Sequence, residues 1–134
     1  MSDRSGEWLA QAEHDLEQAR LSRTGRLFDW ACFAAQQAAE KAVKAVHFRL
    51  GREVWGHVVR RLLEQLPEDL AVSPELLDQA RVLDAYYVPT RYPNGHPEGA
   101  PREHYGELQA REAIGHAESI VAWCRAAMAK RGGG

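Results

Sequence analysis

A stripe of small residues constrains the fold of this chain more than any other feature. Between residues 28 and 50, alanine recurs at steps of three and four, the spacing that places side chains on one face of an α-helix. The stripe begins at Leu27 and continues through five alanines: Ala31, Ala34, Ala38, Ala42 and Ala45. Short side chains let neighbouring helices approach closely. The sequence therefore predicts a tightly packed helix that ends near Gly51.

Apolar residues at helical spacing predict four further helices. They cover residues 7–20, opened by Ser5; residues 57–66; a helix capped by Ser73 that runs to Pro89; and a long helix from Pro101. Alternating strand patterns are absent from the sequence. We therefore expect an all-α fold: an antiparallel up-and-down bundle of four longer helices and one short helix. We expect one domain over residues 1–134, with a frayed tail from about residue 130.

Net charge, apolar runs and the spacing of cysteines and histidines exclude several classes of protein function. The net charge of -2 gives no overall basic field of the kind that marks a general nucleic-acid binder. The sequence has no apolar run long enough for a signal peptide or a membrane span, so a cytoplasmic protein is expected. Cys32 and Cys124 lack CxxC or Cys/His spacing and are expected to be buried free thiols. His14, His47 and His104 show no metal-ligand grouping, so neither metal nor cofactor is predicted.

The stretch DAYYVPTRYPNGHPEG, residues 84–99, breaks the helical pattern. Three prolines and two glycines between Arg91 and Pro101 exclude a regular helix there, and long irregular loops in compact domains often carry function. Tyrosine rings can stack on a base, and arginine can bind phosphate. The alternative is that these residues only stabilise the fold. The tyrosines would then pack in the core, and Arg91 would pair with Asp84 or with a carbonyl of the last helical turn.

Several segments together resemble the HEPN family of small prokaryotic helical domains. They are AEHDLEQA at 12–19, FAAQQAAEKAVKA at 33–45, LDAYYVPTRYP at 83–93 and AIGHAESIVAW at 113–123, with His57 and Tyr105 between them. The resemblance implies a homodimeric or higher oligomeric helical bundle that binds a nucleotide or RNA. It also implies a minimal nucleotidyltransferase partner in a toxin-antitoxin type pair.

The resemblance and the residue chemistry give a set of candidate nucleotide-binding residues: Asp84, Tyr87, Thr90, Arg91, Tyr92 and Lys41. Gln36, Gln37, Glu40 and Lys41 match the family's helix motif, and the alternative that Glu40 and Lys41 are solvated or paired on a helix surface stays open. His57 is interpreted as a histidine that caps a helix or lies in the core.

Two other functions compete with nucleotide binding. Many members of the superfamily are metal-independent ribonucleases with an arginine followed closely by a histidine, and Arg91 with His96 fits that spacing as a catalytic pair. Arg52 with His57 and Arg111 with His116 fit it equally, so spacing alone is weak support. Tyr92 also departs from the small polar residue usual after the motif arginine. The second alternative is a non-enzymatic helical adaptor.

Overall fold

Five α-helices form the regular structure of residues 3–132, the part of the chain that the computed structural model describes. They are α1 (Ser5–Thr24), α2 (Phe28–Arg49), α3 (Val59–Glu64), α4 (Pro74–Asp84) and α5 (Glu107–Gly132). No strand occurs within these residues. The predicted all-α bundle of four longer helices and one short helix is confirmed. α5 continues into the tail that was expected to fray, and residues 133–134 lie outside the described part.

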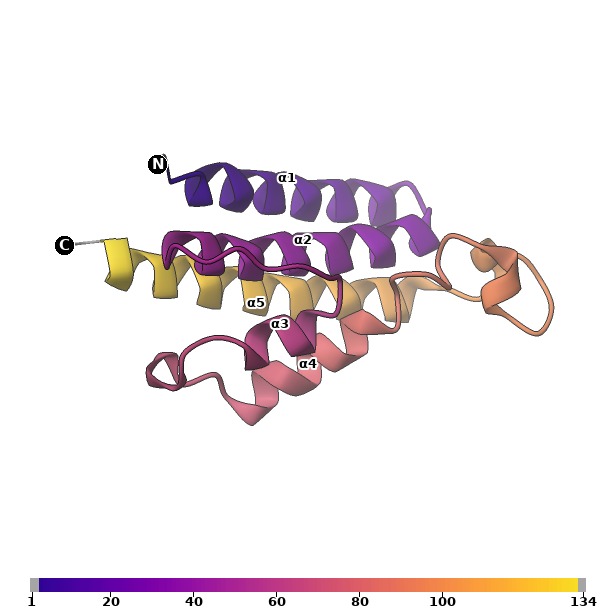
Figure 1. Ribbon diagram of the computed structural model, residues 1–134. Coiled ribbons are helices and arrows are strands. Elements are labelled where there is room, and N and C mark those ends of the chain that lie inside the picture. The colour runs from indigo at the N-terminus through magenta and orange to yellow at the C-terminus, as the bar shows by residue number, and fades with distance from the viewer. Residues whose placement is uncertain (1–2, 133–134) are drawn as a thin grey trace.

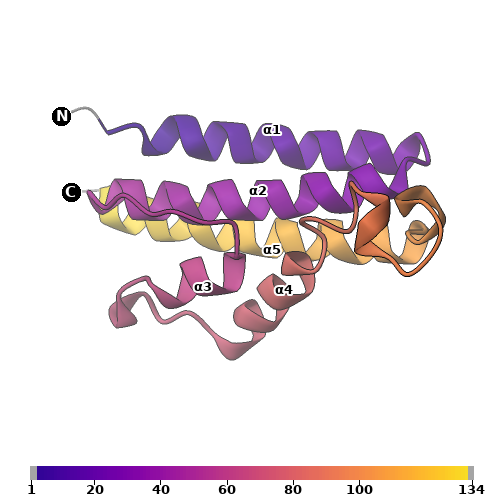
Figure 2. The same ribbon diagram turned by 45° about the vertical axis from the view of Figure 1, so that its right-hand side comes forward.

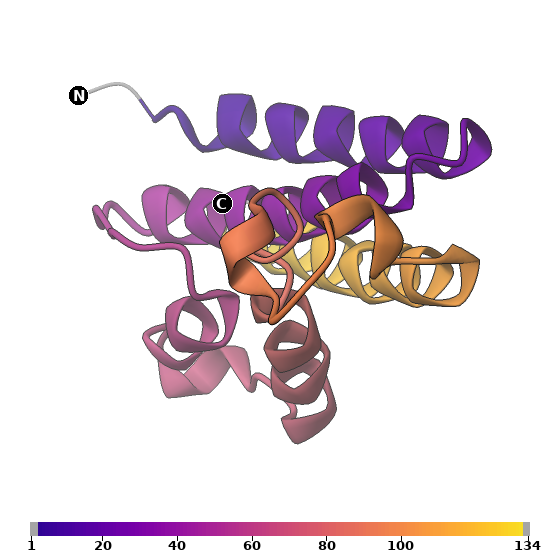
Figure 3. The same ribbon diagram turned by 90° about the vertical axis from the view of Figure 1, so that its right-hand side faces the viewer.

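Helix α2 is the centre of the bundle. It packs against each of the other four helices, most extensively against α1 and α5. Figure 1 shows α2 and α5 in the middle of the bundle, with α1 on one side of them and α3 and α4 on the other side. The four longer helices alternate in direction along the chain, so both termini lie at one end of the bundle (Figures 1 and 2). The irregular segment 85–106 covers the other end, which faces the viewer in Figure 3.

The alanine stripe predicted on α2 is buried. Ala31, Ala38, Ala42 and Ala45 are all fully inaccessible to solvent. The neighbouring helices contribute further buried alanines, at positions 12 and 19 on α1 and at 110, 113 and 117 on α5. Small side chains on both sides of a helix contact allow a short distance between the axes. Close helix packing therefore follows directly from the sequence spacing.

The two cysteines are buried and unpaired, as expected. Burial raises the pKa of the Cys32 thiol to about 12 and raises that of the Cys124 thiol as well. A thiol reacts as the thiolate, which these environments disfavour. Both residues therefore serve as small apolar groups in the core.

The start of the first helix differs from the prediction. Ser5 does not cap α1: Arg4 occupies that position and makes no capping hydrogen bond with its side chain, whereas the carboxylate of Asp3 accepts the N–H of Ser5 at 2.8 Å. Ser5 is the first helical residue and is fully buried, with its hydroxyl accepting a hydrogen bond from Nε of Arg49 at 2.9 Å. The serine joins α1 to the end of α2, a long-range contact that local capping preferences do not reveal.

The third helix is shorter than predicted, because the chain after Gly51 runs in extended and irregular conformation as far as Val58. His57 therefore precedes the helix instead of lying in it. The free N–H groups at the start of α3 donate to the carboxylate of Asp84, at 2.6 Å from Val59 and 3.1 Å from Arg60. A side chain from α4 thus supplies the cap of α3.

The predicted bounds of the last two longer helices also need correction. Ser73 caps α4 as expected, accepting the N–H of Leu76 at 3.1 Å, but the helix ends at Asp84 and does not continue to Pro89. The final helix begins at Glu107, not at Pro101. Residues Pro101–Glu103 form a single 3-10 turn, held by a hydrogen bond from the N–H of Ala100 to the Glu103 carboxylate at 2.7 Å. Within residues 3–132, every helix is too short or too polar to cross a lipid bilayer.

Candidate functional site

Arg91 lies among three aromatic rings at the loop end of the bundle. Its Cζ atom is 4.4 Å from the ring centre of Phe33, 4.6 Å from that of Tyr87 and 5.2 Å from that of Tyr92. Its Nε donates to the carbonyl of Tyr87 at 2.8 Å. No carboxylate in residues 3–132 pairs with this arginine. The side chain is therefore held in place while its terminal N–H groups and its charge stay available.

Tyr87 connects Arg91 to a second polar group. The imidazole of His57 stacks on the Tyr87 ring, with ring centres 4.5 Å apart and an angle of 17° between the planes. Phe33 of α2 also contacts Tyr87, at 6.2 Å between ring centres. Residues from α2, from the segment before α3 and from the segment after α4 thus meet at one place.

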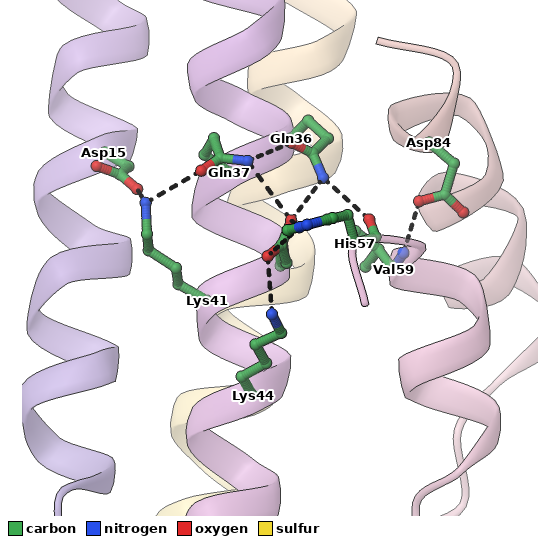
Figure 4. A network of polar contacts seen from close by, with 9 residues as sticks. Asp15, Gln36, Gln37, Lys41, Lys44, His57, Val59 and Asp84 are labelled. Atoms are coloured by element: carbon green, nitrogen blue, oxygen red, sulfur yellow. Dashed lines mark hydrogen bonds and ion pairs between the residues drawn. The ribbon is translucent and has the colours of Figure 1, made fainter. Parts of the chain in front are cut away.

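Behind His57 lies a buried charged network centred on Glu40, whose side chain is only 6% exposed. Nδ1 of His57 is 3.0 Å from one carboxylate oxygen of Glu40, and Nζ of Lys44 is 3.0 Å from the same oxygen. Gln36, fully buried, donates to the other oxygen at 3.1 Å and to the carbonyl of His57 at 3.2 Å. Figure 4 shows Gln36 and Lys44 on α2, with Gln36 extending toward His57 on the segment that precedes α3.

The network continues across the other side of α2. Gln37 donates to Gln36 at 2.8 Å, and Lys41 donates to Gln37 and pairs with Asp15 of α1. Figure 4 places Asp15 on one side of this network and Asp84, which accepts the N–H of Val59, on the other side. Asp15, Gln37 and Lys41 line an open cavity of about 450 Å³ between α1 and α2, and Phe33 lines it too. Phe33 therefore borders both this cavity and Arg91.

The structure separates the six residues predicted to bind a nucleotide. Tyr87, Arg91 and Tyr92 lie together, and Tyr92 is 49% exposed. Thr90 is 1% exposed and donates its hydroxyl to the carbonyl of Tyr86. Asp84 caps α3, and its burial raises the pKa of its carboxyl. Lys41 pairs with Asp15, so the side-chain polar groups of Asp84, Thr90 and Lys41 are already bound by other groups of the protein.

His96, the predicted catalytic partner of Arg91, is part of the loop's own packing. Its Nε2 is 2.7 Å from the carbonyl oxygen of Pro89, and its ring stacks on His104 with centres 4.0 Å apart. The edge of Tyr105 also approaches it, at 5.7 Å between ring centres. The histidine that shares a tyrosine with Arg91 is His57.

Sequence reasoning therefore missed the pairing of His57 with Glu40 as part of this site. The available signal was the position of Glu40 within the QQAAEK motif and of His57 among the segments that resemble the HEPN family. Neither residue reveals its partner through local spacing, because 17 positions separate them. Within residues 3–132, no three His, Cys, Asp or Glu side chains are arranged to hold a metal ion.

Fold and site together define a small all-helical protein with an unneutralised arginine and exposed aromatic side chains at one end of the bundle. The chain belongs to the HEPN domain family, whose family model matches residues 5–127. The resemblance inferred from the sequence motifs is thereby confirmed.

Three solved structures are similar to the chain over nearly its whole length. TT1696 from Thermus thermophilus is 46% identical, with a TM-score of 0.92, covering 94% of this chain and 99% of that one. ST0689, described as an archaeal HEPN homologue, is 41% identical, with a TM-score of 0.79 and coverage of 95% and 99%. A HEPN domain protein (tm0613) from Thermotoga maritima is 36% identical, with a TM-score of 0.73 and coverage of 90% and 95%. No curated protein is significantly similar to the chain.

Proposed function

We propose that the protein binds a nucleotide or a short RNA element at Arg91, with Tyr87 and Tyr92 as aromatic surfaces beside it. The observation that carries this proposal is the state of the Arg91 side chain. Its Nε is held by the Tyr87 carbonyl and its plane lies against aromatic rings, yet no carboxylate of residues 3–132 neutralises it. Other arginines such as Arg20, Arg23 and Arg125 form ion pairs with glutamates.

The chemistry of such an arginine suits phosphate. A guanidinium offers N–H donors in a planar fork that matches two phosphate oxygens, and prior fixation reduces the entropy lost on binding. Tyr92 is half exposed and presents a ring on which a base can stack. Asp84 and Thr90 stabilise the segments that carry the site. The carboxylate of Asp84 caps α3, and the hydroxyl of Thr90, the residue before Arg91, donates to the carbonyl of Tyr86. Lys41 lies farther along α2, at the cavity that Phe33 shares with the site.

The binding test compares Arg91→Ala with Arg91→Lys, using calorimetry with ATP and fluorescence anisotropy with a labelled single-stranded RNA. We expect Arg91→Ala to weaken binding by a few-fold to some hundred-fold, about 1 to 3 kcal/mol for a charge-assisted contact. Lysine keeps the charge but loses the fork, so Arg91→Lys should restore only part of the affinity. Arg111→Ala, which removes an exposed arginine from α5, is the matched control. Equal affinity of the Arg91→Ala and Arg111→Ala proteins would refute the proposal.

The family resemblance extends the proposal to partners. We propose that the chain acts in the cytoplasm as a homodimer or higher oligomer, together with a minimal nucleotidyltransferase in a toxin-antitoxin type pair. Co-expression of this chain with a nucleotidyltransferase encoded next to it, followed by size-exclusion chromatography, tests the partnership. Elution of the two proteins as separate species at micromolar concentration would count against it and would favour the adaptor alternative.

Ribonuclease activity predicts a different pattern of variants. If Arg91 and His96 are catalytic, both Arg91→Ala and His96→Ala abolish cleavage of single-stranded RNA in the presence of a chelator. The binding proposal expects no cleavage and little effect of His96→Ala on affinity, since Nε2 of His96 already contacts the Pro89 carbonyl. Cleavage that depends on both residues would replace the binding proposal with the enzymatic one.

A further inference from the structure

We propose that His57 is a second anion-binding group of the Arg91 site, and that the site takes ligands with two linked phosphate groups. The inference rests on the proposed nucleotide or RNA binding and specifies its ligand chemistry. It is carried by the way Glu40 orients His57, by the shared contact of His57 and Arg91 with Tyr87, and by the charge balance around them.

Glu40 determines which nitrogen of His57 faces a ligand. A carboxylate only accepts hydrogen bonds, so Nδ1 of His57 carries a proton and donates it to Glu40 at 3.0 Å. Within residues 3–132, no protein group hydrogen-bonds the other ring nitrogen, Nε2. The His57 side chain is 52% exposed, whereas Glu40 is 6% exposed. The imidazole is thus fixed from the buried side and open on the solvent side.

The shared tyrosine gives the arrangement of the two cationic groups. The centre of the Tyr87 ring is 4.5 Å from the centre of the His57 ring and 4.6 Å from Cζ of Arg91. The two groups therefore lie beside one aromatic ring but are not in contact through any hydrogen bond. The two distances to the ring set an upper bound on the separation of His57 and Arg91, and two linked phosphates can contact one group each within that bound.

The surrounding ion pairs leave the charge of Arg91 available to an anion. On α2, the Glu40 carboxylate is balanced by Lys44, and Lys41 is balanced by Asp15 of α1. Across from them, Asp84 of α4 accepts the N–H groups that begin α3, and Arg60 pairs with Glu64. Arg91 therefore contributes one positive charge that no carboxylate of residues 3–132 pairs with, and His57 lies beside the same tyrosine.

This arrangement couples binding to a proton. With Nδ1 donating to Glu40, Nε2 of a neutral His57 carries a lone pair, and phosphate oxygens also only accept. A contact between an ionised phosphate and Nε2 therefore requires the imidazolium form, whose extra proton comes from the buffer or from the terminal phosphate of the ligand. Ligands that reach His57 should therefore take up more protons on binding than ligands that contact only Arg91.

The test uses calorimetry on the full chain with ADP and AMP, near neutral pH and in two buffers of different ionisation enthalpy. We expect tighter binding of ADP than of AMP, and a greater proton uptake with ADP than with AMP. His57→Gln keeps a polar side chain but removes the titrating ring. It should lower ADP affinity about ten-fold, leave AMP affinity within about two-fold and remove the difference in proton uptake between ADP and AMP. His14→Gln, an exposed histidine change on α1, is the control and should alter neither ligand.

The outcomes separate this inference from the binding proposal. If Arg91→Ala weakens ADP binding but His57→Gln changes neither affinity nor proton uptake, the inference is wrong and the proposed function stands. If the wild-type protein binds neither nucleotide nor RNA, the proposed function fails and the inference fails with it. A 5′-phosphorylated diuridylate, which carries two phosphates along an RNA backbone, distinguishes the source. Tighter binding of this dinucleotide than of ADP identifies RNA as the source of the two phosphates. Tighter binding of ADP identifies a free nucleoside diphosphate.

Discussion

Glu40 holds the ring of His57 at 3.0 Å although the two residues belong to different elements, α2 and the segment before α3. The same carboxylate oxygen contacts Lys44, so one buried acid serves two cationic groups. Removing a charge from water is costly unless partners satisfy it. The stability of a charged group in a core of alanine and valine therefore depends on these contacts.

Loss of the Glu40 carboxylate should destabilise the fold strongly. Glu40→Ala leaves Lys44, whose side chain is only 10% exposed, without its ion-pair partner. Breaking one partner of a buried pair costs about 3 to 5 kcal/mol. Replacing both residues by methionine should recover most of that loss, because no charge then remains buried. Urea denaturation measures both, with Glu17→Ala, a 58% exposed glutamate, as the control. A Glu40→Ala protein as stable as this control would show that the pair is solvated.

Asp84 should stabilise α3 through its two backbone hydrogen bonds. Asp84→Ala leaves the N–H groups of Val59 and Arg60 without their acceptor, which costs about 1 to 2 kcal/mol for a lost helix cap. Asp78→Ala, an exposed change on α4, should cost far less. Hydrogen exchange would show faster exchange at residues 59–64 in the Asp84→Ala protein. Unchanged protection there would contradict the capping role.

The effect of Asp84→Ala should also depend on pH. Burial raises the pKa of the Asp84 carboxyl, although hydrogen bonds from Arg60 and Val59 oppose this. The folded protein therefore holds the proton more tightly than the unfolded chain does. The contribution of Asp84 to stability grows as pH falls through the raised pKa and levels off below the ordinary value of the group. Relative to Asp84→Ala, the wild-type protein should gain stability between about pH 7 and about pH 4.

A larger side chain in the alanine stripe should overpack the centre of the bundle. Ala38 is fully buried on α2, where neighbouring helices leave no room for added carbon atoms. Ala38→Leu should therefore cost about 1 to 3 kcal/mol. Ala10→Leu makes the same change at an exposed site on α1 and should have little effect. An unchanged urea midpoint for Ala38→Leu would refute close packing at this position.

The chain should form a homodimer or a higher oligomer in solution. Leu21, Leu27 and Trp30 remain 59%, 55% and 49% exposed in the single chain, and exposed apolar side chains favour association. A symmetric interface would place the same surface of two copies across an axis. Sedimentation equilibrium from about 1 to 100 micromolar should show a mass at least twice that of the chain. Only monomer throughout this range would contradict the prediction.

Local sequence was enough to predict most of the helices and part of the site. The buried positions of α2 follow from helical periodicity, and Ser73 caps α4 as its residue type and position indicate. Tyr87 and Arg91 are four positions apart, so the contact between the arginine and a nearby carbonyl was one of the expected alternatives. These features depend on residues that are close in the chain, where backbone geometry limits the arrangements.

The pairings that complete the site depended on long-range packing. His57 reaches Tyr87 and Glu40 only because the segment after Gly51 lies against α2, and Asp84 caps α3 only because α4 folds back beside it. His96, the candidate catalytic partner of Arg91, stacks on His104, a contact that the sequence did not predict, and its catalytic role stays a prediction.

The sequence by itself determined an all-α protein with a closely packed central helix and an irregular, arginine-bearing segment after α4. It did so because helical periodicity, side-chain size and proline positions act over a few residues. Only the tertiary structure decided that His57, and not His96, shares Tyr87 with Arg91. That choice depends on which distant segments bury apolar surface against each other, because burial acts on the whole fold and leaves no local spacing to read.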